Sequence, residues 1–179
     1  MIMAKKGTTK FKSNKQEKSV SAELNGKTVV GSGARWFADS DVKTDKFLVE
    51  CKTTSKNYFA VTTKLWEKIA KEAVKDHCRI PLMIIDLNDD TVHDKERYVV
   101  FNPSDFGATL EPYDCTASED TKSFRVKSGM LEEISRETDM NVLGKLFNIQ
   151  STQHNKKYHM LMCTKIETFL DVFKLELEE

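Results

Sequence analysis

The sequence lacks the features that mark several broad classes of protein. It has no apolar run near the roughly 18 residues that cross a membrane, and no apolar signal-peptide core follows its basic first residues. Its four cysteines are far apart and form no CxxC pair, which argues against a disulfide framework or a zinc site. No internal repeat or low-complexity tract is present. We therefore expect a protein of the reducing cytoplasm, without a membrane partner, whose cysteines are buried apolar residues. The cysteines are Cys51, Cys78, Cys115 and Cys163.

The chain also lacks net charge, but its charges are unevenly divided. Residues 1–80 carry 17 Lys and Arg against 9 Asp and Glu, whereas residues 81–179 carry 11 against 19. One half is therefore basic and the other acidic. A basic half favours a surface that meets a polyanion such as DNA, and the alternative is a chance scatter of charge over solvated helices.

The length and the pattern of apolar residues predict one mixed α/β core with an appended segment. Residues 1–12 are basic and aperiodic, so we interpret them as a flexible arm in which Lys5 and Lys6 can touch phosphates. A plain disordered terminus is the alternative. Residues 13–105 are expected to form a mixed sheet flanked by helices, and residues 106–179 an α+β C-terminal extension of unknown role. Within the core we expect helices at 13–24 and 64–77, and strands at 27–30, 47–53, 57–61, 81–87 and 97–101.

A charged β-hairpin is the centre of the functional prediction. Side chains alternate between the two faces of a strand, so Glu50 and Lys52 point the same way. A two-residue turn at 45–46 places Asp41 opposite Glu50, whereas a turn shifted by one residue places Asp39 there. We favour Asp41.

Two carboxylates beside a lysine are the groups that a metal-dependent phosphodiesterase needs. Mg²⁺ prefers oxygen ligands, which Asp41 and Glu50 can provide, and the backbone carbonyl of Cys51 can add a neutral one. Lys52 can orient the nucleophile and stabilise charge on the phosphate. Glu17, on the first predicted helix, can hold a water or a second ion. The alternative is a surface hairpin with a cross-strand ion pair, although a charge within a mostly apolar strand is costly without a partner or a role.

Other residues are candidates for contact with DNA. Ser32 lies in a Gly-Ser-Gly loop whose small residues suit a close approach to a phosphate, and Arg35 follows it. Lys64 and Lys68 begin a row of lysines on the second predicted helix. An ordinary turn and a solvated helix face are the respective alternatives.

The spacing of these residues resembles a known family. Asp41 followed by Glu50-Cys51-Lys52 matches the PD-(D/E)XK nuclease signature, with Ser40 where proline often stands. Together with the segments 17–24 and 29–33, it resembles the core of the archaeal and phage Holliday junction resolvases over about residues 12–87.

The resemblance implies a restriction-endonuclease-like fold and a function. It implies that Glu17, Asp41, Glu50 and Lys52 form the catalytic set and that Ser32 lies near the scissile phosphate. It further implies Mg²⁺, for which Mn²⁺ can substitute, and a homodimer that makes paired cuts across a four-way DNA junction during recombination, in a bacterial or phage-infected cytoplasm. The alternatives are another nuclease of this class, acting on duplex or flapped DNA, and a non-catalytic DNA-binding protein with the same fold.

Overall fold

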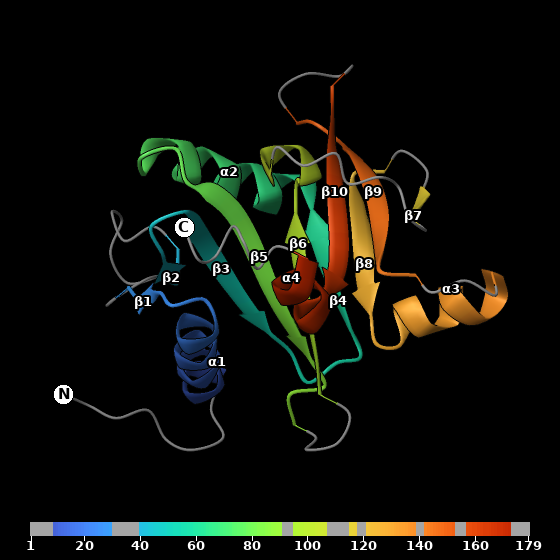
Figure 1. Cartoon of the computed structure of the whole chain (residues 1–179), viewed down its shortest axis with the longest axis horizontal. Coiled ribbons are helices and arrows are strands. Elements are labelled where there is room, and N and C mark those ends of the chain that lie inside the picture. Colours follow the sequence, from blue (N-terminus) through green and yellow to red (C-terminus); the bar gives the residue numbers. More distant parts are fainter. Residues whose placement is uncertain are drawn as a thin grey trace.

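A large mixed β-sheet forms the centre of the molecule (Figure 1). The computed structural model describes residues 9–29, 40–90, 95–106, 115–117, 121–138, 142–152 and 157–172. In these residues an eight-stranded sheet has the order β1-β2-β3-β5-β6-β10-β9-β7. Its strands are β1 (Lys27–Thr28), β2 (Val42–Lys43), β3 (Phe47–Thr53), β5 (Ile80–Leu87), β6 (Glu96–Phe101), β7 (Cys115–Ala117), β9 (Gly144–Gln150) and β10 (Tyr158–Lys165).

The connection between β3 and β5 builds one side of the molecule. These two strands are parallel, so the chain must cross over between them, and it does so through β4 (Tyr58–Thr62) and α2 (Thr63–Lys75). β4 does not join the main sheet but pairs antiparallel with β8 (Ser123–Lys127). We call this separate pair the β4–β8 ribbon.

Each face of the sheet has its own helical cover and its own apolar cluster. On one face lie α1 (Thr9–Glu23), the 3₁₀ helix η1 (Pro103–Phe106) and α4 (Ile166–Val172), whose apolar side chains pack against alternate residues of β3, β5 and β6. On the other face lie α2, the inner side of the ribbon and α3 (Met130–Thr138). The predicted mixed α/β architecture, a sheet flanked by helices, is therefore confirmed.

The structure changes several details of the prediction. α1 begins at Thr9, so the last residues of the predicted arm are helical, and residues 1–8 lie outside the described part. The strand β9 was not predicted. Residues beyond 106 contribute β7, β9 and β10 to the main sheet, so the expected division at residue 105 does not separate two sheets.

The cysteines and the helices bear on two further expectations. Cys51 and Cys163 are buried as expected, but Cys78 is exposed because it lies in the turn after α2, where its φ is 56°. The side chain of Cys115 lies outside the described residues. Among the described helices, none is long and apolar enough to cross a membrane.

Candidate functional site

The β2–β3 hairpin has the predicted register. The Thr44 hydroxyl accepts hydrogen bonds from the amides of Phe47 (2.8 Å) and Lys46 (3.2 Å), which closes a tight turn. Val42 then pairs with Val49, as the predicted turn at 45–46 requires, and the two paired residues of β2 end there, so Asp41 lies just beyond the ladder. Asp39, the alternative ligand, lies outside the described residues.

Asp41 interrupts the regular ladder of hydrogen bonds between β2 and β3. Its amide donates to the carbonyl of Val49 (3.0 Å), the residue that is already paired with Val42. The carboxylate Oδ2 of Asp41 accepts a hydrogen bond from the amide of Cys51 (2.8 Å). Ser40, just before it, has a φ of 59°. The Asp41 side chain thus takes the place of a strand partner and is fixed next to the backbone between Glu50 and Lys52.

Glu50 is a buried carboxylate on an interior strand. β3 lies between β2 and β5, and Glu50 is only 6% exposed. Its partner is Lys52, whose Nζ forms an ion pair with Oε1 of Glu50. The intervening Cys51 side chain faces the apolar cluster that also contains Val20 of α1, and burial raises the pKa of its thiol well above the ordinary value. Cys51 can therefore serve this site only through its backbone.

Glu17 approaches the hairpin from α1. It accepts a hydrogen bond from the Ser13 hydroxyl (2.9 Å) and is half-buried. Burial raises its pKa, and repulsion from Asp41 and Glu50 raises it further, whereas the Ser13 hydrogen bond and the charge of Lys52 lower it. The three carboxylates therefore share one electrostatic environment. Within the described ranges, however, no three His, Cys, Asp or Glu side chains are arranged to hold a metal ion together.

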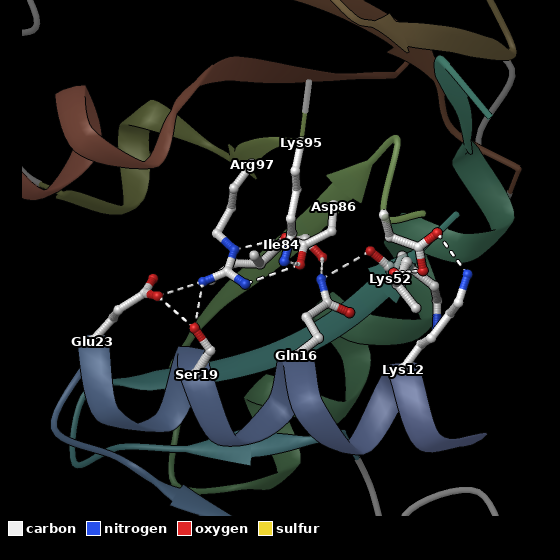
Figure 2. A network of polar contacts seen from close by, with 11 residues as sticks. Lys12, Gln16, Ser19, Glu23, Lys52, Ile84, Asp86, Lys95 and Arg97 are labelled. Atoms are coloured by element: carbon white, nitrogen blue, oxygen red, sulfur yellow. Dashed lines mark hydrogen bonds and ion pairs between the residues drawn. The ribbon is translucent and has the colours of Figure 1, made fainter. Parts of the chain in front are cut away.

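The position of Glu17 depends on how α1 is attached, and this attachment is largely polar (Figure 2). Gln16 is 2% exposed, and its Nε2 donates to the carbonyls of Lys52 (2.9 Å) and Ile84 (3.3 Å). A helix that began at residue 13, as predicted, would place Gln16 in its first turn, where it could cap the helix. Because α1 begins at Thr9, Gln16 instead lies within the helix and anchors it to β3 and β5.

A buried ion-pair network holds the same helix one turn further along. Arg97 of β6 donates from Nε and Nη2 to the two carboxylate oxygens of Asp86 (2.6 and 2.9 Å), and its Nη1 reaches Ser19 (3.1 Å) and Glu23 (2.5 Å) of α1. Lys95 also contacts Asp86 (2.7 Å). Burial would raise the pKa of Asp86, but the hydrogen bonds and charges of Arg97 and Lys95 hold it below the ordinary value.

Sequence reasoning missed this network, because it joins residues from three separate elements, α1, β5 and β6. The available signal is an aspartate in the apolar strand β5 followed by an arginine near the start of β6. Lys12, at the beginning of α1, makes a further contact by pairing with Asp89 (3.1 Å) and Asp90.

The predicted DNA contacts are only partly described. Lys5, Lys6, Ser32 and Arg35 lie outside the described residues. Lys64 and Lys68 are exposed on α2, and Nζ of Lys68 lies 3.5 Å from Oε1 of Glu72.

Comparisons with known proteins give little beyond this geometry. No protein-family model matches the chain, and no curated protein matches it. A similar solved structure is that of Hjc, a Holliday junction resolvase from the archaeal hyperthermophile Archaeoglobus fulgidus, with 15% sequence identity and a TM-score of 0.39. The match covers 68% of this chain and 96% of that chain. A likeness at this level carries no argument about activity.

Proposed function

We propose that this chain is a metal-dependent DNA endonuclease with a restriction-endonuclease-like core, which hydrolyses phosphodiester bonds and resolves four-way junctions. One observation carries the proposal. The Asp41 carboxylate is held on the Cys51 amide, beside the buried Glu50 and its partly exposed partner Lys52. Burying charge within a sheet is costly, which favours a role for these groups beyond packing.

The residues fit a divalent cation by the chemistry of their donors. Asp41 and Glu50 offer carboxylate oxygens, the Cys51 carbonyl can add a neutral oxygen, and Mg²⁺ and Mn²⁺ prefer such ligands. Mutual repulsion among Glu17, Asp41 and Glu50 helps to raise the pKa of Glu17, and a cation among them would relieve that repulsion. When bound there, the ion would neutralise phosphate charge and lower the pKa of an attacking water.

The side chains around the ion would have separate tasks. Lys52, now paired with Glu50, would turn toward a phosphate oxygen and stabilise the charge that develops on it. Glu17, with its raised pKa, would orient a water by hydrogen bonding. A homodimer would bring two such sites to the paired strands of a junction.

A second candidate is a DNA-binding protein without catalytic activity. The ion pair between Glu50 and Lys52 satisfies both groups without a metal, and the described residues contain no three-ligand group, both of which favour this alternative. A nuclease of the same class that acts on duplex or flapped DNA is the other possibility within the enzyme class.

A cleavage assay separates these candidates. Purified protein would be incubated with labelled four-way junctions, flaps, linear duplex and single strands, in Mg²⁺ or in EDTA. Symmetric cuts on junctions alone support the resolvase. Cuts on duplex or flaps retain the nuclease and reject the junction specificity. DNA binding without metal-dependent cutting rejects the enzyme.

The site itself is tested by Glu50→Gln. This variant should lose cleavage, because it removes a ligand, but should bind DNA as well as or better than the parent, because it also removes a negative charge. Asp45→Asn is the matched control, since it removes one charge from the exposed turn of the same hairpin and should cut normally. Normal cleavage by Glu50→Gln would show that the site is misplaced.

A further inference from the structure

The outer face of the β4–β8 ribbon is polar and basic. The register pairs Tyr58 with Lys127, Ala60 with Arg125 and Thr62 with Ser123, and all six residues are exposed. The alternate residues of both strands point inward, where Val61, Phe124 and Val126 join the apolar core. Strand alternation thus places one set of side chains together on the solvent side.

This face has an unusual balance of charge. Five exposed cations lie on the ribbon or at its ends, and the segments 56–64 and 122–127 contain no Asp or Glu. No ion pair joins any of the five to a carboxylate in the described part of the chain, so the charge of the face is not neutralised by neighbouring carboxylates there. We call these residues the ribbon cations, namely Lys56, Lys64, Lys122, Arg125 and Lys127.

An aromatic ring organises the cations at one end of the face. The Arg125 guanidinium lies 5.2 Å and the Lys56 ammonium 5.7 Å from the centroid of the Tyr58 ring. Attraction to the ring offsets part of the repulsion between the two like charges and restrains both side chains. Two positive groups are therefore restrained beside one ring before any partner binds.

A small cavity lies at the other end of the face. It has a volume of about 340 Å³ and is lined by Lys64 and Lys122 together with hydroxyl and amide side chains of Thr62, Thr63, Gln150, Ser151 and Thr152. Ser151 and Thr152 donate their hydroxyl protons to Glu67, which lies behind them. Among the residues that line the cavity, Lys64 and Lys122 carry positive charge and none carries negative charge.

We propose that this ribbon face is a second DNA-binding surface, which contacts the phosphate backbone without reading the base sequence. This inference rests on the proposed function and adds a surface that the DNA would contact outside the cleavage site. A five-residue strand spans about 16 Å, or roughly five base-pair steps at 3.4 Å each. The two ends of the face can therefore meet phosphates several nucleotides apart on one duplex.

The chemistry of the face favours DNA over an acidic protein. Protein interfaces have an apolar centre and few charges there. Here the central pair of the ribbon face is Ala60 and Arg125, so the centre itself offers a cation and no apolar patch, and further cations lie at both ends. Interfaces with DNA are more polar and much more positively charged, which matches this arrangement.

Binding in the absence of metal tests the proposal without relying on cleavage. Fluorescence anisotropy would follow the full chain on labelled duplex and junction DNA in EDTA, at several salt concentrations. The variant Lys56→Gln/Arg125→Gln/Lys127→Gln should bind roughly tenfold or more weakly, and its plot of log K against log salt should lose roughly two to three units of slope. The control Lys18→Gln/Lys27→Gln/Arg136→Gln removes the same charge from exposed positions outside the ribbon and outside the lysine row of α2, and should change neither quantity by as much.

Each result has one meaning. Equal losses in both triple variants, or no loss in the ribbon variant, would overturn the inference while leaving the cleavage proposal intact. An absence of DNA binding by the parent would instead reject the proposed function. Ribbon-dependent binding of polyglutamate that is tighter than binding of DNA would assign the face to an acidic protein. Should the triple variant fail to fold, Lys64→Gln/Lys122→Gln, which changes residues outside the ribbon strands, must weaken DNA binding for the inference to stand.

Discussion

Replacing Arg97 by methionine should destabilise the protein through the charge that it leaves behind. The Asp86 side chain is 1% exposed and that of Arg97 is 10% exposed, so the pair is effectively out of water. Methionine fills much of the same volume but donates no hydrogen bond. Asp86 would keep only Lys95, whose side chain is 38% exposed, and α1 would lose the contacts from Arg97 to Ser19 and Glu23.

The size of the effect follows from this burial. Removing one partner of a buried ion pair costs about 3–5 kcal/mol of stability. Because Lys95 still pairs with Asp86, the expected cost of Arg97→Met is at the lower end, about 3 kcal/mol. Glu23→Gln disturbs the exposed side of the same network, since its side chain is 32% exposed, and should cost at most about 1 kcal/mol. The double variant Asp86→Leu/Arg97→Met removes both charges together and should cost less than Arg97→Met alone.

Urea unfolding and hydrogen exchange measure the two consequences. The free energy of unfolding gives the total cost, and exchange at the amides of α1 shows whether the helix opens more readily than the sheet. A cost below about 1 kcal/mol for Arg97→Met, or exchange in α1 equal to that of the parent, would refute the view that this network holds the helix. In that case the apolar contacts of Val20 and Leu24 would be enough to hold α1.

Two further substitutions test other features of the structure. Glu17→Gln should stabilise the protein at neutral pH, because burial and repulsion raise the pKa of Glu17 above 4.5 in the folded protein. The parent therefore loses stability as the pH rises and the buried carboxyl ionises, and the two proteins should have the same stability below about pH 4. Urea unfolding between about pH 3 and 7 measures the difference, and a difference that did not change with pH would contradict the prediction. Gly144→Ala should lower the free energy of unfolding by roughly 1–3 kcal/mol, measured by thermal or urea unfolding. A Cβ there would lie 2.4 Å from Cε of Met162 and 3.1 Å from the carbonyl oxygen of Cys163. Unchanged stability would mean that β10 can shift to make room.

The parts of the site that are local in sequence could be predicted. The β2–β3 hairpin follows from a turn and an alternating pattern within about a dozen residues, and its register is the one that the predicted turn requires. Asp41 lies just beyond the paired residues, with its carboxylate on the amide of Cys51. The roles of these residues in catalysis and metal binding remain predictions. Glu17 could be named from the sequence only as a candidate, since nothing local shows which way a mostly polar helix faces.

The attachment of α1 and the ribbon could not be predicted, because both depend on distant pairings. Gln16 meets the Ile84 carbonyl across 68 positions of the chain, and Arg97 meets Ser19 across 78. β4 looks like any other strand in the sequence, and its separation from the main sheet is decided by β8, which follows the whole predicted core. A pattern of apolar residues shows which side of an element is buried, but it does not show which element covers that side.

The place of β10 in the sheet has a consequence for the order in which the chain folds. β10 inserts between β6 and β9, so β6 keeps an open edge until a strand from far along the chain arrives. The waiting edge is strongly apolar, with Tyr98, Val99, Val100 and Phe101 fully buried once folding is complete. Open apolar edges recruit strands from other molecules, and long-range pairings form slowly. Chains interrupted before β10 should therefore aggregate during synthesis, even though every residue of the β2–β3 hairpin has already been made.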